Sequence, residues 1–283
     1  MPAPIKPSFI ETVRHDVYET IDPRTTLVNK AHGKTVLITG AGRGIGRAIA
    51  IAFAHAGASR LILTARTVSQ LEQVANEIKT IANNIEVINV ETDVANESQV
   101  EALFHGIKGV VDILVNNAGY IERNNPLGET DMKEWWSIWE INVKGTYLPT
   151  TYFLKNYKGA GTIINTSSIG SIVTTPGYSA YQPTKTAINR ITDFIHVEYP
   201  NARVFSYHPG GVQTELAKRL PDNMFVLEDK PELAAGYCVW LTTDEADFLR
   251  GRYSDCTWDV TELLKNAKMI VDMDLLKEEV KMG

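Results

Sequence analysis

The chain has 283 residues, of which 44% are hydrophobic and 22% are charged, and its formal net charge is −6. These proportions are typical of a globular protein, and the acidic balance argues against a nucleic-acid-binding surface. No apolar run reaches the roughly 20 residues of a membrane-spanning helix, the first residues lack the apolar core of a secretory signal, and two cysteines make no disulfide framework. We therefore expect a cytoplasmic protein with no membrane partner and no bound metal.

Residues 1–33 precede the first predicted strand. They are rich in polar residues and proline, and the prolines at 2, 4, 7 and 23 argue against long regular structure. Two alternatives stay open for this N-terminal extension: an arm that lies over the domain or over a neighbouring subunit, or a disordered tail.

The stretch from Thr35 to Ala50 predicts a strand, a glycine turn and a helix. Glycine lets a ligand approach the main chain closely, and a helix that begins after such a turn directs free N–H groups toward the gap. That arrangement suits a pyrophosphate, although a glycine turn without a ligand is the alternative. The predicted dinucleotide cradle consists of Gly40, Gly42, Arg43, Gly44, Ile45 and Gly46.

Predicted strands and helices then alternate along the chain. The strands cover residues 61–65, 85–90, 110–115, 162–165, 203–207 and 251–256, and helices follow over 68–78, 98–107, 131–157, 184–197 and 231–241. Alternation of this kind implies a parallel sheet with helices on both faces, and right-handed crossovers make it a doubly wound fold. A bound cofactor is then expected at the carboxyl ends of the strands.

Three stretches of this pattern carry further expectations. Pro149 lies inside the predicted helix 131–157 and should kink it or end it early. Residues 215–230 resemble a mobile insertion. The last residues, rich in Leu, Lys and Glu, form a terminal helix or tail. We expect an N-terminal extension (1–33), one Rossmann-type domain (34–260) and a C-terminal tail (261–283).

Several motifs occur in an order that identifies a family. The glycine turn does not fit G-x-G-x-x-G in any register but fits T-G-x-x-x-G-x-G. Tyr181 lies thirteen residues after Ser168, and Lys185 follows Tyr181 by four residues. Together with residues 116–119 (Asn-Asn-Ala-Gly) and 209–214 (Pro-Gly-Gly-Val-Gln-Thr), this pattern resembles the short-chain dehydrogenase/reductase family from about residue 34 to residue 260. The resemblance implies an α/β fold with a seven-stranded parallel sheet of order 3-2-1-4-5-6-7.

The resemblance also implies a catalytic set of Asn142, Ser168, Tyr181 and Lys185. Lys185 and the oxidised nicotinamide should favour the phenolate and so lower the pKa of Tyr181, which then exchanges a proton with substrate. Ser168 binds the substrate oxygen, and Asn142 holds a water that links Lys185 to solvent. Besides the glycine turn and the pair Tyr181 and Lys185, the expected cofactor contacts are Arg66, Asp93, Val94, Asn116, Ala118, Gly119, Pro209, Gly210, Val212 and Thr214.

The chain departs from the family pattern at two places. Pro183-Thr184 replaces the usual Ala-Ser, a change that the first turn of a helix tolerates. Trp258-Asp259-Val260 stands where Asp-Gly-Gly is common, which puts the usual C-terminal subunit contact in doubt. The family commonly forms dimers or tetramers through its two long helices, here 131–157 and 184–197.

The residues after the second predicted strand bear on the choice of cofactor. Enzymes that use NAD place an acid there to bind the ribose hydroxyls, whereas this chain has Ala65 and then Arg66. Arg66 and Arg43 suit a 2′-phosphate, which predicts NADP(H), although a solvated Arg66 is the alternative.

The leading functional hypothesis is an NADPH-dependent carbonyl reductase or alcohol dehydrogenase. Its small-molecule substrate is expected to be a medium-sized hydrophobic ketone that contacts Ser168, Ile169, Tyr178 and Leu216. The alternatives are a nucleotide-binding sensor or scaffold without turnover, and an epimerase or dehydratase that retains its cofactor.

Overall fold

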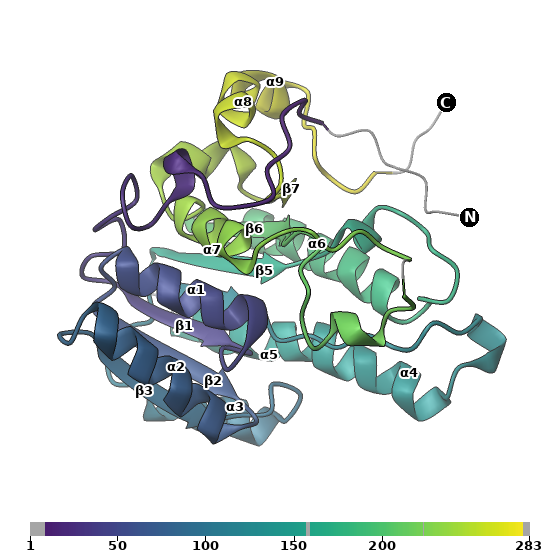
Figure 1. Ribbon diagram of the computed structural model, residues 1–283, viewed down its shortest axis with the longest axis horizontal. Helices are drawn as coiled ribbons and strands as arrows, with labels where there is room; N and C mark the ends of the chain where they lie inside the picture. The colour runs from purple at the N-terminus through teal and green to yellow at the C-terminus, as the bar shows by residue number, and fades with distance from the viewer. Residues whose placement is uncertain (1–8, 157–158, 223, 280–283) are drawn as a thin grey trace.

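The computed structural model describes residues 9–156, 159–222 and 224–279 (Figure 1). Within these residues a seven-stranded sheet has the order β3-β2-β1-β4-β5-β6-β7, and all neighbouring strands run parallel. The predicted fold class and strand order are therefore confirmed. The strands are β1 (Thr35–Thr39), β2 (Arg60–Ala65), β3 (Glu86–Glu91), β4 (Ile113–Asn116), β5 (Gly161–Thr166), β6 (Ala202–His208) and β7 (Tyr253–Asp255).

Two hydrophobic cores lie on opposite faces of this sheet. Successive side chains of a strand point to opposite faces, so Val36 and Ile38 of β1 enter one core while Leu37 enters the other. The first core includes α1 (Gly44–His55), α2 (Val68–Ile81) and α7 (Pro231–Trp240); the second includes α3 (Glu97–Gly106), α5 (Gly145–Lys155) and α6 (Tyr181–Glu198). Both faces of the central strands are buried, as a doubly wound sheet requires.

The expected long helix 131–157 is divided differently from the prediction. It consists of α4 (Met132–Trp139), a π-helical turn (Glu140–Lys144) and α5, and α5 continues past Pro149. Of the two effects expected of Pro149, a kink or an early end, the early end does not occur, because α5 continues to Lys155. Pro149 lacks the N–H that would bond to Gly145, the residue at the junction of the π turn and α5, where the bonding pattern changes already. Tyr157, the predicted end of the helix, lies outside the described residues.

Helix α6 also differs from the expected range 184–197, because it begins three residues earlier, at Tyr181. Pro183 consequently lies in the first turn, where its missing N–H would have no partner within the helix in any case. The early start places Tyr181 and Lys185 on successive turns of one helix.

The N-terminal segment, from residue 9 onward, packs along the C-terminal part of the chain. Figure 1 shows the purple segment beside the yellow helices α8 (Val260–Lys265) and α9 (Ala267–Asp272). Arg14 forms an ion pair with Asp259, and Thr12 bonds to Glu262. Ile10 and Ile21 are buried in the first core. Of the two alternatives for the extension, the arm over its own domain describes residues 9–33; the prolines at 2, 4 and 7 lie outside the described residues.

None of the helices in the described part of the chain is both long and apolar enough to cross a membrane.

Candidate active site

A cavity of about 790 Å³ lies at the carboxyl ends of the central strands. The turn after β1, the residues after β2 and β3, the segment after β4 and the segment after β6 all contribute to its walls. Many of the expected cofactor contacts line it, namely Gly40, Gly42, Arg43, Gly44, Ile45, Gly46, Arg66, Asp93, Val94, Ala118, Gly119 and Thr214.

Three glycines of the turn occupy positions where a side chain would be strained or would clash. Gly40 and Gly44 have φ values of +65° and +55°, in the left-handed region. At Gly46 a Cβ atom would lie 2.2 Å from the Gly40 carbonyl oxygen. The first N–H groups of α1 follow this turn and lack partners within the helix, so a group with the shape and charge of a pyrophosphate fits here.

The segment after β4 holds the turn in place. Asn117 donates from Nδ2 to the carbonyl oxygens of Thr39 (3.0 Å) and Gly40 (3.3 Å), and the Thr39 hydroxyl accepts from the N–H groups of Asn117 and Ala118. The neighbouring Asn116 faces the other way and donates to Thr150 (2.9 Å) and Asn165 (2.8 Å). Asn116 thus does not reach the cavity, although we expected it to contact the cofactor; it joins β4 to β5 and α5.

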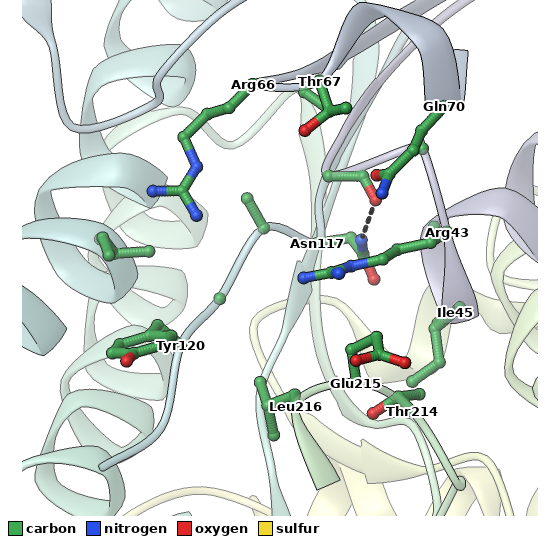
Figure 2. Close-up of a pocket in the computed structure, with 18 of the residues that line it drawn as sticks. Arg43, Ile45, Arg66, Thr67, Gln70, Asn117, Tyr120, Thr214, Glu215 and Leu216 are labelled. Carbon is green, nitrogen blue, oxygen red and sulfur yellow. Dashed lines mark hydrogen bonds between the residues drawn. The ribbon is translucent and has the colours of Figure 1, made fainter. Parts of the chain in front are cut away.

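Two arginines extend into the cavity, as Figure 2 shows for Arg43 and Arg66. Neither belongs to an ion pair among the residues that the structure describes. Arg43 faces Glu215, whose pKa is lowered mainly by a hydrogen bond from Lys218 and in smaller part by the charge of Arg43. Thr67, which lines the same wall, adds a hydroxyl. No carboxylate from the end of β2 faces these groups, since residues 65–67 are Ala, Arg and Thr.

Ser168, Tyr181 and Lys185 converge behind this cavity. Lys185 donates from Nζ to the Thr166 carbonyl oxygen (2.8 Å), and its Nζ lies 5.5 Å from the centre of the Tyr181 ring. Ser168 lies at the end of β5, where its hydroxyl accepts from the Gly170 N–H (3.0 Å), and it bonds to the Tyr181 phenol. The topology therefore brings these three side chains together. They do not line the cavity itself.

Burial dominates the ionisation of the pair. Burial raises the pKa of Tyr181 to about 12, and the hydrogen bond from Ser168 opposes this only in part. Burial also lowers the pKa of Lys185 to about 8. In the protein by itself Lys185 does not bring the pKa of Tyr181 below its ordinary value, because a low-dielectric site penalises both charged forms. The lowering expected from Lys185 together with an oxidised nicotinamide stays a prediction.

Asn142 lies in the π-helical turn and is fully buried. Its side chain bonds to Tyr120 in both directions, accepting from the N–H (2.8 Å) and donating to the carbonyl (2.9 Å), and it also donates to Thr184 (3.0 Å). The main-chain carbonyl of Asn142 accepts a hydrogen bond from the Thr146 hydroxyl (2.7 Å). These contacts connect the segment after β4 with α6, close to Lys185.

The segment after β6 covers the other side of the site. Pro209 and Gly210 follow the strand, and Val212 pairs with Asp229, so that the described residues between them, 213–222 and 224–228, form a loop over the cavity. We call residues 213–222 and 224–228 the lid. Arg219 fastens it by donating to the Ile121 carbonyl (2.8 Å) and by an ion pair with Glu134. Pro209, Gly210 and Val212 stand beside the cavity without lining it, whereas Thr214 and Leu216 line it.

Tyr178 is 2% exposed and lies under the lid. Its hydroxyl approaches the Met224 sulfur (3.6 Å), and its ring meets Phe225 edge-on at 5.9 Å. Ile169 begins the short helical turn that follows Ser168. Neither residue lines the cavity.

Sequence reasoning missed several residues of the site. Gln70, Asn117 and Arg219 line the cavity, and Glu122 binds the start of α6. Of these residues, only Asn117 belongs to a motif named above, the Asn-Asn-Ala-Gly of residues 116–119. Folding brings the others to the site from other parts of the chain, and no local spacing in the sequence indicates them. Among the described residues no cluster of His, Cys, Asp or Glu could hold a metal ion.

A doubly wound sheet, a glycine turn before α1 and a Ser-Tyr-Lys group beside it define an α/β oxidoreductase that uses a nicotinamide dinucleotide. The model of the short chain dehydrogenase family matches residues 34–224. The chain belongs to this family, which acts on CH–OH groups with NAD(P)(H) and a small-molecule substrate.

Known relatives agree with this assignment. A short chain dehydrogenase of Monascus purpureus is 44% identical over 283 residues, covering 95% of each chain. The structure of a 3-ketoacyl-(acyl-carrier-protein) reductase from Brucella melitensis, complexed with NADH, is similar with a TM-score of 0.72 and 29% identity, covering 80% of this chain and 97% of that one. A gluconate 5-dehydrogenase from Burkholderia cenocepacia, in complex with NADP and tartrate, gives a TM-score of 0.71 and 26% identity, over 81% and 96% of the chains.

Proposed function

We propose that this protein is an NADPH-dependent carbonyl reductase, or an alcohol dehydrogenase in the reverse direction, with Tyr181 as the proton donor. The observation that carries the proposal is the convergence of Tyr181 with Ser168 and Lys185 beside the dinucleotide cavity. When bound, the reduced nicotinamide supplies a hydride to the carbonyl carbon.

The three side chains divide the work on the carbonyl oxygen. Tyr181 is held as a phenol, since burial raises its pKa, and it donates its proton to the oxygen as negative charge develops there. Ser168 stabilises the same charge by a hydrogen bond. Lys185, whose pKa of about 8 lies close to neutrality, passes a proton toward Tyr181. Asn142 keeps the segment after β4 against α6, beside Lys185.

The cavity supports NADP(H) as the cofactor. The glycine turn and the N-terminus of α1 suit the pyrophosphate, and Arg43, Arg66 and Thr67 supply two cations and a hydroxyl for a 2′-phosphate. Asp93 lines the wall that we assign to the adenine. No carboxylate at the end of β2 would repel the 2′-phosphate, since residues 65–67 are Ala, Arg and Thr.

The lid supports a medium-sized hydrophobic substrate. Leu216, Leu227 and Tyr120 line the cavity. The ring of Tyr178 contacts the ring of Phe225, which belongs to the lid. These apolar surfaces favour a bulky or aromatic ketone over a sugar.

The decisive experiment compares wild type with Tyr181→Phe on a panel of bulky aromatic ketones and small polar ketones. We expect the wild type to consume one NADPH per alcohol formed and the variant to lose turnover while it still binds NADPH. A fully active variant would refute the proposal. A wild type that binds NADPH but turns over no member of the panel would favour a sensor, and product formed without net NADPH consumption would favour an epimerase or dehydratase.

We also propose that the protein is cytoplasmic and forms a homodimer or homotetramer through α4, α5 and α6. Met132 and Trp136 on α4 and Val197 on α6 are 79%, 62% and 76% exposed, which supports an apolar contact between subunits. Sedimentation equilibrium tests the association, and a monomer at micromolar concentration would refute it.

A further inference from the structure

Glu122 is a buried acid that the proposed mechanism does not use. It lies three residues after Gly119, in the connection between β4 and α4, and is 2% exposed. Its carboxylate accepts hydrogen bonds from the Ala180 N–H (2.8 Å) and from the Tyr181 N–H, which lies 3.1 Å from both oxygens. A carboxylate from another element thus holds the backbone of the residue that we assign as proton donor.

The start of α6 has no cap of its own. Ala180 occupies the N-cap position and has no side chain that accepts a hydrogen bond. The first N–H groups of a helix lack partners within it, and an anion is stabilised beside them. Glu122, which lies 59 residues before Tyr181, therefore caps the start of α6 as a Ser or Asp at position 180 would do locally.

The charge of Glu122 is not balanced by a neighbouring cation. No ion pair in the described ranges includes it, and its hydrogen-bond partners are the two backbone N–H groups. The groups that face Tyr181 are Lys185 on its own helix, Ser168 after β5, and Glu122. The charge of Glu122 also acts on Tyr178 in the preceding turn. Burial is the largest cause of the raised pKa of Tyr181, and the charge of Glu122 acts in the same direction.

Building on the proposed function, we propose that Glu122 is a positioning residue for Tyr181. It fixes the backbone at the start of α6, and its negative charge adds to burial in keeping the phenol protonated, so that Glu122 extends to higher pH the range over which Tyr181 acts as an acid. In the reverse reaction the same charge opposes formation of the phenolate, so that oxidation needs a higher pH than it would without Glu122.

The test uses Glu122→Gln, which keeps an acceptor oxygen for the two N–H groups and removes the charge. Loss of a nearby negative charge lowers the pKa of Tyr181. Reduction needs the phenol, so the alkaline limb of kcat/KM moves to lower pH; oxidation needs the phenolate, so its acid limb moves to lower pH as well. We expect both midpoints to fall by about one pH unit. Glu129→Gln, the same change at an exposed position of the same connection, should leave both midpoints in place.

A spectroscopic arm makes the test independent of turnover. The near-ultraviolet absorbance of tyrosinate is titrated in the wild type, in Glu122→Gln, and in each of these combined with Tyr181→Phe. The contribution that disappears with Tyr181→Phe belongs to Tyr181, and its midpoint should be lower in the Glu122→Gln background. This arm reports on Glu122 even if Tyr181 proves not to be the proton donor.

The outcomes separate the two proposals. If Tyr181→Phe is inactive and Glu122→Gln loses kcat equally at every pH, with unmoved midpoints in both arms, Glu122 is only a helix cap and our inference is wrong while the proposed function stands. If Tyr181→Phe is fully active, the proposed function fails, and the spectroscopic midpoint alone decides on Glu122.

Discussion

The two halves of the site are built in different ways. The cofactor half is a turn of backbone between β1 and α1, clipped by Asn117, and it opens onto a cavity of about 790 Å³. The half that we propose for the substrate consists of Tyr178, which contacts Met224 of the lid, and Tyr181, whose N–H bonds to Glu122, so that contacts between segments far apart in the chain hold it. The cofactor half depends on glycine positions where a side chain would clash or be strained, whereas the other half depends on contacts between side chains.

This difference determines how each half tolerates substitution. In the glycine turn a carbon atom added at Gly46 meets the backbone of Gly40, which cannot move without displacing the turn itself. In the lid a substituted side chain meets other side chains, which can change rotamer to accommodate it. We therefore expect the effects of substitutions to decrease from the turn, through the charged wall of the cavity, to the lid.

The largest effect is expected for Gly46→Ala. The new Cβ would lie 2.2 Å from the Gly40 oxygen and 2.6 Å from Asn117 Nδ2, so the turn must shift. Overpacking of this kind costs about 1–3 kcal/mol. We expect NADPH affinity to fall about 100-fold, measured by fluorescence titration, because the cradle N–H groups move with the turn. Gly128→Ala, with no atom within 4 Å of its Cβ, is the control. Equal affinities in the two variants would contradict a backbone-built cradle.

Arg66→Asp tests the charged wall of the same half. A hydrogen bond to a charged group contributes about 1.5–3 kcal/mol. We expect kcat/KM for NADPH to fall about 10–100-fold, while the value for NADH changes little or rises. Lys79→Asp, an equal change of charge at the exposed far end of α2, controls for long-range electrostatics. The proposal of NADP(H) fails if the wild type already uses NADH and NADPH with comparable efficiency.

The sequence predicts the cofactor half well because its determinants are local. The strand, the glycine turn and the first part of the helix lie within the single stretch 35–50, and the spacing of Tyr181 and Lys185 is a property of one helix. Parallel strands also bring their carboxyl ends to one edge, so the positions of Ser168 and residues 116–119 follow from the order of the strands. The adjacent pair Asn116 and Asn117 marks the limit, since packing decides which of the two side chains lines the cavity, and the structure has Asn117 there.

The substrate half could not be predicted to the same depth. The start of α6 depends on Glu122, and the break in the helix 131–157 depends on a π turn rather than on the visible proline. The pKa of Tyr181 in the protein by itself depends mainly on burial, which a sequence does not display. The contact of Glu122 with α6 joins residues from distant parts of the chain, and no local spacing records it.

The smallest effect is expected in the lid, where Arg219→Met removes its fastening. Arg219 bonds to the Ile121 carbonyl, pairs with Glu134 and lies 4.7 Å from the centre of the Tyr120 ring. Both members of the ion pair are about one quarter exposed, so the pair is less screened than a surface pair. We expect the KM of the ketone to rise about 3–10-fold with little change in kcat, and amide hydrogen exchange to quicken around residues 217–219.

The adjacent ion pair provides a matched comparison on the same helical turn. Lys218 pairs with Glu215, but these side chains are 71% and 48% exposed. Exposed pairs contribute about 0.2–1 kcal/mol, so Lys218→Met should change KM less than Arg219→Met does and leave hydrogen exchange nearly as in the wild type. The difference between these two methionine variants measures what the long-range contacts of Arg219 add. If Arg219→Met were as costly as Gly46→Ala, the lid would be as intolerant of change as the turn, and the distinction between the two halves would be wrong.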